Sequence, residues 1–120
     1  MAKPEPVRGG VTFDLEAIDR ELRDEPAYQH GGLTSRTLIR TDDMRVVFLV
    51  LKTGREMQKH QVDETACVHV LSGTVTMRLP DRAVELSKGE LLVMERGLAH
   101  DVVASEDSTL LITFGWDASR

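Results

Sequence analysis

Four histidines and one cysteine are the residues of this chain best suited to chemistry at neutral pH. A neutral imidazole can act as an acid, a base, a hydrogen-bonding anchor or a metal ligand. Cys67 lies within a run of strand-forming residues, which favours a buried, inert thiol. The sequence shows no nucleophile elbow, no phosphate-binding loop and no Ser-His-Asp order. Any chemistry is therefore expected to centre on imidazole.

Composition narrows the classes of protein to be considered. With 120 residues, 41% of them hydrophobic and 29% charged, the chain is expected to form one domain around one core. Its apolar runs are strand-sized, shorter than the roughly 18 residues of a membrane span. The net charge of −5 and the dispersed basic residues argue against nucleic-acid binding. The N-terminal residues include no apolar signal segment, so a cytoplasmic location is expected.

The N-terminal segment, which precedes the elements that position these residues, differs from the rest of the chain in composition and pattern. Residues 1–10 contain two prolines and a Gly-Gly pair and are expected to form an extended arm. From Asp14 to Arg23 apolar residues recur at helical spacing, which predicts a short amphipathic helix whose charged face is solvated. We therefore assign residues 1–33 to an arm and helix, and residues 34–120 to a β-barrel, within one structural domain.

The remainder of the chain consists of short Val-, Leu-, Ile- and Thr-rich runs separated by turn residues every eight to twelve positions, a rhythm typical of a sandwich or barrel. Two runs, 46–51 and 109–114, are apolar at nearly every position, so both of their faces are expected to be covered. The cover is either the N-terminal helix or a second subunit. The predicted strands are 36–40, 44–51, 66–71, 74–79, 83–86, 91–94, 101–104 and 109–114.

Two segments carry a resemblance to a known family. The segment 54–73, which runs from Gly54 through His60 to Ser72-Gly73, resembles the first cupin motif, and the segment 89–100, with its G-x7-G-x2-H spacing, resembles the second. The chain is similar to small single-domain cupins of the RmlC-like, type-2 kind. This resemblance implies an all-β double-stranded β-helix, or jelly-roll barrel, usually a homodimer, with a ligand or metal site inside the barrel mouth.

The resemblance also implies a set of metal ligands, and this chain lacks half of it. Metal-binding cupins bring two histidines and a glutamate from the first motif and one histidine from the second. His60 and His100 match two of these positions, whereas Val62 and Ala66 occupy the others. A divalent ion needs about three protein donors to be held against water, so two imidazoles alone make a weak site. Replacement donors with less suitable spacing are Gln58, Glu64 and Glu95.

The other histidines have simpler interpretations. If the residues that alternate with His69 point into the barrel, its ring points away from the lumen, and it is a reserve candidate ligand only. His30, beside Gly31-Gly32, is expected to lie exposed in a loop. Three methionines at strand spacing are candidates for filling the barrel interior, where they would make a cavity adaptable: Met57, Met77 and Met94.

Two functions follow from these residues. The first is binding of a small organic ligand inside the barrel, without turnover, by residues near the two motif histidines: His60, His100, Gln58, Val62 and Ala66. The alternative is a metal-dependent enzyme of the dioxygenase or isomerase type, which would hold Zn, Fe, Mn or Ni through His60 and His100 with His69 in reserve. The sequence leaves open whether the protein is an enzyme. A homodimer is expected in either case, with no nucleic-acid or membrane partner.

Overall fold

The computed structural model describes residues 7–115, and within that range the side chains of all residues except Lys59 and His60. Two helices precede nine strands. The helices are α1 (Leu15–Arg23) and α2 (Pro26–Gly31). The strands are β1 (Leu33–Arg40), β2 (Met44–Leu51), β3 (Glu56–His60), β4 (Thr65–Ser72), β5 (Thr74–Arg78), β6 (Ala83–Ser87), β7 (Leu91–Met94), β8 (His100–Ala104) and β9 (Ser108–Gly115).

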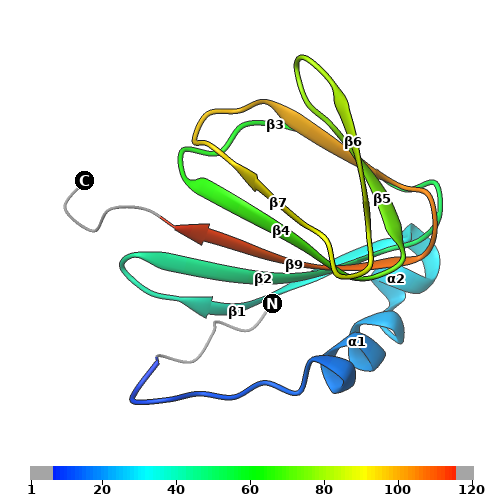
Figure 1. The fold of residues 1–120 in the computed structure, drawn as a ribbon. Coiled ribbons are helices and arrows are strands. Elements are labelled where there is room, and N and C mark those ends of the chain that lie inside the picture. Colours follow the sequence, from blue (N-terminus) through cyan, green and yellow to red (C-terminus); the bar gives the residue numbers. More distant parts are fainter. Residues whose placement is uncertain (1–6, 116–120) are drawn as a thin grey trace.

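The strands form two antiparallel sheets that face each other (Figure 1). The five-stranded sheet has the order β1-β2-β9-β4-β7, and the four-stranded sheet has the order β3-β8-β5-β6. Each sheet combines strands that are distant in the sequence, since β9 lies between β2 and β4 and β8 lies between β3 and β5, as in a jelly roll. The predicted fold class, an all-β double-stranded β-helix with a short N-terminal helix, is confirmed.

The helices lie against the outer face of the five-stranded sheet, beside β1 and β2 (Figure 1). Helix α1 begins after Asp14, whose Oδ1 accepts a hydrogen bond from the Ala17 amide at 3.1 Å and so satisfies one exposed donor of the first turn. This matches the predicted helix within one residue. Neither described helix is long and apolar enough to cross a membrane.

Strand β2 shows why a continuous apolar run is needed at the centre of the fold. Leu49 and Leu51 face the other sheet, whereas Phe48 and Val50 pack under the helices with Leu22. All of these side chains are at most 3% exposed. Burial on both faces removes the alternation seen in half-buried strands. For β2 the expectation of two covered faces is therefore confirmed, and the helices supply the outer cover.

Two elements differ from the sequence-based expectation. Residues 26–31 form α2 rather than a loop, so His30 lies in a helix, where it is exposed as expected. Pro26 starts this helix and Gly32, at φ +74°, ends it, so the helix is too short to show periodicity. Strand β3 was not predicted, because its sequence Glu-Met-Gln-Lys-His contains no apolar run. It is an edge strand that depends on backbone hydrogen bonds to β8.

Candidate functional site

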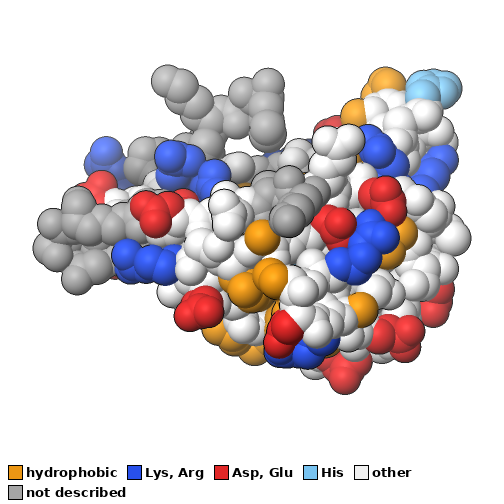
Figure 2. All heavy atoms as spheres, turned by 90° about the horizontal axis from the view of Figure 1, so that it is seen from above, with side chains coloured by type: hydrophobic (Ala, Val, Ile, Leu, Met, Phe, Trp, Pro, Cys, Tyr) orange, Lys and Arg blue, Asp and Glu red, His pale blue; other side chains and the backbone are white. Residues whose placement is uncertain are grey.

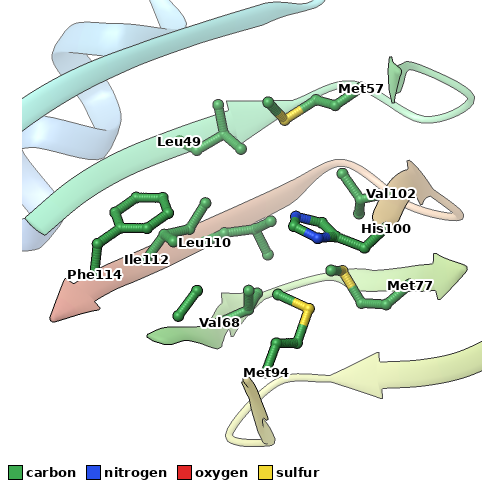
Figure 3. Close-up of a pocket in the computed structure, with 11 residues that line it drawn as sticks. Leu49, Met57, Val68, Met77, Met94, His100, Val102, Leu110, Ile112 and Phe114 are labelled. Atoms are coloured by element: carbon green, nitrogen blue, oxygen red, sulfur yellow. The ribbon is translucent and has the colours of Figure 1, made fainter. Parts of the chain in front are cut away.

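A small cavity lies between the two sheets, with a volume of about 30 Å³. A volume of this size holds one or two water molecules. Ten of the lining side chains are apolar and one is polar, the imidazole of His100 (Figure 3). The lining consists of Leu49, Met57, Ala66, Val68, Met77, Met94, His100, Val102, Leu110, Ile112 and Phe114.

Strand register explains how distant residues line one space. In the five-stranded sheet, Phe114 of β9 pairs with Ala66 of β4, which pairs with Met94 of β7. In the four-stranded sheet, Val102 of β8 pairs with Met57 of β3 on one side and with Met77 of β5 on the other. Residues paired across neighbouring strands share a face, so these two rows form opposite walls. The three methionines proposed from the sequence to fill the barrel interior do line the cavity.

His100 is the polar group of this wall. The residue is only 7% exposed, and its Nδ1 lies 2.9 Å from the carbonyl oxygen of Leu98. Because a carbonyl oxygen can only accept, Nδ1 donates the proton, and in the neutral ring Nε2 carries the lone pair. Figure 3 shows the ring among the lining side chains, close to the sulfur-bearing ends of Met77 and Met94. Among the described residues, the arrangement presents one imidazole to an apolar space.

His60 pairs with His100 in the backbone register of β3 and β8. A register irregularity separates this pair from Met57 and its partner Val102. The His60 side chain lies outside the described residues, so the expectation that the two imidazoles meet in the pocket stays a prediction.

The other predicted ligand-binding residues lie in different environments. Ala66 is 2% exposed and lines the cavity. Val62 is partly buried and packs against the same core, but it does not line the cavity. Gln58 lies on β3 with its side chain exposed, outside the cavity lining. Of these three residues, only Ala66 lines the cavity together with His100.

His69 and Asp101 lie on outer faces. His69 pairs with Leu111 and Leu91 and alternates with the buried, inward residues Val68 and Val70, so it lies away from the cavity. The Asp101 carboxylate accepts a hydrogen bond from Arg78 at 2.5 Å, outside the four-stranded sheet.

Arg78 ties together three strands of that sheet. Its guanidinium donates to Asp101 of β8 and, at 2.6 Å, to Glu56 of β3. These hydrogen bonds, the one to Asp101 first, raise the pKa of Arg78 above its ordinary value. Asp101 therefore supports the edge strand that carries His60 rather than orienting the imidazole of His100.

The described residues do not fit the metal site expected for the family. Among them there is no group of three or more His, Cys, Asp or Glu side chains that could hold a metal ion. Ala66 occupies the glutamate position and offers no donor, and Val62 likewise stands at a histidine position. A borderline divalent ion would find one described imidazole here, surrounded by hydrocarbon and thioether groups.

The surface around the fold is mixed in charge. On the face shown in Figure 2, Lys and Arg side chains lie near Asp and Glu side chains, and hydrophobic side chains are visible at several places between them.

Sequence reasoning missed several site residues. Leu49, Ile112 and Phe114 belong to strands that were predicted, but their inward orientation follows only from register. Arg45 was also missed: it is a lone basic residue at the start of an apolar strand, and its guanidinium lies 4.3 Å over the Phe114 ring.

Comparisons with known proteins agree with this architecture. A conserved protein of unknown function from Streptococcus pyogenes, SPY1581, has a similar structure with a TM-score of 0.72 and 21% identity, over 98% of this chain and 96% of that one. KdgF from Halomonas sp. is similar with a TM-score of 0.67 and 24% identity, over 72% of this chain and 80% of that one. No curated protein sequence matches the chain.

A larger enzyme contains a similar unit. A mutant of salicylate 1,2-dioxygenase from Pseudoaminobacter salicylatoxidans matches with a TM-score of 0.75 and 16% identity, over 86% of this chain but only 34% of that one. At this identity the similarity shows the fold alone. The Cupin_2 family model, described as a cupin domain, matches residues 47–114, which is more than half of the chain. Together with the two facing sheets, this match shows that the chain belongs to the cupin domain family.

Proposed function

We propose that this cupin binds a small organic ligand inside its barrel, beside His100. The observation that carries the proposal is the cavity itself, in which ten apolar side chains surround one imidazole. Ligand sites in proteins are mostly apolar with a few polar groups that fix orientation. The expected ligand therefore has a small apolar or aromatic body.

The cavity must enlarge to admit such a ligand, because a volume of about 30 Å³ has room for only one or two water molecules. Met57, Met77 and Met94 are the side chains best able to move. Methionine is unbranched and has three rotatable bonds, so it repacks around a guest with little strain. Because the cavity wall is apolar and adaptable, we expect it to select ligands by their size and shape rather than by many hydrogen bonds.

His100 is the side chain that would orient the ligand in the cavity. With Nδ1–H donating to the Leu98 carbonyl, its ring is held in the tautomer in which Nε2 is the acceptor nitrogen. A ligand hydroxyl or amide hydrogen is the kind of donor that this nitrogen accepts. His60, opposite His100 in register, is the proposed second anchor. Binding of this kind needs no turnover.

A matched pair of histidine variants tests the proposal. Binding of a panel of small aromatic and aliphatic molecules would be followed by NMR and thermal shift on the wild type, His100→Leu and His69→Leu. The same substitution on the outer face of β4 serves as the control, because His69 lies away from the cavity. We expect His100→Leu to weaken binding and His69→Leu to leave it unchanged. Equal binding by both variants would refute the assignment.

The alternative is a metal-dependent cupin enzyme of the dioxygenase or isomerase type. The register pair of His60 and His100 supports it, since the two motif histidines are the family ligands that this chain retains. The poor fit of the other donors weighs against it. Elemental analysis after reconstitution with Zn, Fe, Mn or Ni decides the question: less than about a tenth of an equivalent of metal would exclude this function.

We also propose that the protein forms a homodimer through the outer face of the five-stranded sheet. The helices cover that face beside β1 and β2, whereas Leu91 and Val93 on β7 remain 56% and 59% exposed. A second copy would bury these apolar side chains. The cytoplasmic location stays an expectation from the sequence.

A further inference from the structure

Arg45 lies near one end of the ladder between β2 and β9. In the register of the five-stranded sheet it pairs with Phe114, which pairs with Ala66 on its other side. Both of these partners line the cavity, so Arg45 continues their inward-facing row. Only the pair of Met44 and Gly115 lies beyond it in the ladder between β2 and β9. Arg45 thus borders the cavity without being part of its wall.

The Arg45 guanidinium is incompletely satisfied. It stacks over the Phe114 ring at 4.3 Å, but its Nε is buried and has no hydrogen-bond partner among the described residues. The ion pairs of the described residues involve other arginines. Stacking on a ring face leaves the N–H donors of the guanidinium edge unused. Buried donors are normally paired, so an unpaired one marks a place where a partner is missing.

A second cation stands opposite. Arg40 of β1 pairs directly with Arg45 of β2 in the register, and the described residues supply neither with a carboxylate partner. Like charges directly opposite each other on neighbouring strands destabilise a sheet. An anion placed between or beside them would relieve that repulsion. The pair therefore leaves positive charge at this end of the sheet without a carboxylate partner among the described residues.

We infer that Arg45, assisted by Arg40, receives the carboxylate of a small apolar carboxylic acid whose body enters the cavity toward His100. This inference rests on the proposed function and names the ligand class for the same site. The planar guanidinium fork matches a carboxylate in geometry, and the charge-assisted hydrogen bonds it makes are about twice as strong as neutral ones. The Phe114 ring, stacked under Arg45 and lining the cavity, joins the cationic and apolar parts of the site.

The size of the ligand follows from strand spacing. Neighbouring strands lie about 4.8 Å apart, so the row from Arg45 through Phe114 to Ala66 spans about 10 Å. A single ring or a chain of about six carbons, ending in a carboxylate, fits within that distance. Longer acids would require displacement of more of the core.

The test compares acids with their neutral amides. Benzoate, phenylacetate and hexanoate, and in parallel benzamide, phenylacetamide and hexanamide, are titrated into the full chain and followed by NMR. The proteins are the wild type, Arg45→Gln, Arg45→Lys and, as control, Arg55→Gln. Arg55 is exposed and lies in the turn after β2, at the opposite end of that strand from Arg45. The control thus loses the same charge far from the site.

We expect the wild type to bind the acids at least about tenfold more tightly than the amides, a preference that falls with added salt. Arg45→Gln should abolish that preference, Arg45→Lys should keep part of it, and Arg55→Gln should keep all of it. Thermal unfolding followed by circular dichroism verifies that each variant is folded.

The failures of the two proposals are distinguishable. If acids and amides bind equally to the wild type, and His100→Leu weakens both, the carboxylate inference is wrong while the ligand-binding function stands. The carboxylate inference is also wrong if Arg45→Gln and Arg55→Gln lower acid affinity equally. If neither acids nor amides bind to the wild type, both proposals fail.

Discussion

His60 and His100 are paired residues of the ladder between β3 and β8, although the two strands belong to different motifs of the chain. Because side chains alternate between faces along a strand, a shift of the register by one residue would separate the two positions. The irregularity between Met57 and His60 sets the final register, and Arg78 braces it by binding Glu56 and Asp101 on the outer face. The edge strand is thus tied to β8 through Arg78 as well as through backbone hydrogen bonds.

This pairing predicts energetic coupling in ligand binding. In a double-mutant cycle, His60→Ala and His100→Ala should be non-additive by at least about 0.5 kcal/mol, because neighbouring residues share a ligand or a hydrogen-bond network. Isothermal titration gives the affinities. The control cycle pairs His69→Ala with His100→Ala and should be additive, since His69 lies on the outer face. Additivity in both cycles would contradict a shared site.

Helix α1 should stabilise the barrel by covering β2. Leu22 is fully buried against Phe48 and Val50, so Leu22→Ala is expected to lower the free energy of unfolding by about 2–5 kcal/mol. Phe13→Ala, which removes a side chain that is 38% exposed, should change it by less than about 0.5 kcal/mol. Urea unfolding measures both values. A loss below about 1 kcal/mol for Leu22→Ala would show that the helix is not the main cover.

Gly73 should tolerate no side chain. Its φ is +82°, and a Cβ there would overlap the Asp107 carbonyl oxygen and the Ser108 hydroxyl oxygen. Gly73→Ala is expected to destabilise the fold by more than about 3 kcal/mol. Gly54 has the same φ of +82° but open space around it, so Gly54→Ala should show only the left-handed backbone strain of about 1–2 kcal/mol. Equal losses in thermal unfolding would mean that the contacts at Gly73 do not matter.

Asp107 should make stability depend on pH in the acid range. Its Oδ1 accepts hydrogen bonds from the Thr53 amide at 2.8 Å and the Thr53 hydroxyl at 2.9 Å, and these bonds lower the pKa of Asp107. A carboxylate whose pKa is lower in the folded state stabilises the fold above its unfolded pKa of about 3.9, and this contribution is lost as the pH falls through the folded pKa.

The variant that tests this pH dependence is Asp107→Asn, which removes the carboxylate. At pH 7 it should be less stable than the wild type by about 0.5–1 kcal/mol, a small value because the carboxylate is exposed to solvent. The difference should vanish below the folded pKa, as urea unfolding at stepped pH would show. Asp81→Asn, which affects an exposed ion pair with Arg82, serves as control. A difference that persists at low pH would point to altered packing instead.

The dimer proposal predicts a change of mass on a single substitution. Light scattering at micromolar concentration should give the dimer mass for the wild type and the monomer mass for Val93→Asp, because a buried carboxylate opposes association. Ala83→Asp, on the exposed side of β6, should leave the dimer intact. A monomeric wild type would show that the helices alone cover the outer face of the five-stranded sheet sufficiently.

Local features of the sequence predicted much of this fold. The strand bounds 44–51 and 91–94 agree with β2 and β7, and the helix agrees within one residue. These segments have strong periodicity or continuous apolar runs, which depend only on neighbouring residues. Strand β3 was not predicted because it is a polar edge strand that forms by pairing with the distant β8, and helix α2 was not predicted because six residues are too few to show periodicity.

The candidate site likewise combines residues that the sequence identified with contacts that only the tertiary structure decided. The resemblance to the two cupin motifs identified His60 and His100 and the substitutions Val62 and Ala66, and residue type at strand spacing identified the methionines, as the residues to consider. The tertiary structure decided which of them meet, because register and the facing of two sheets are long-range properties. It brought His100, Ala66 and the methionines around one cavity and left His69 outside. It also placed Arg45 beside Phe114, a contact that no local pattern indicates, since the two residues are neighbours only across the ladder.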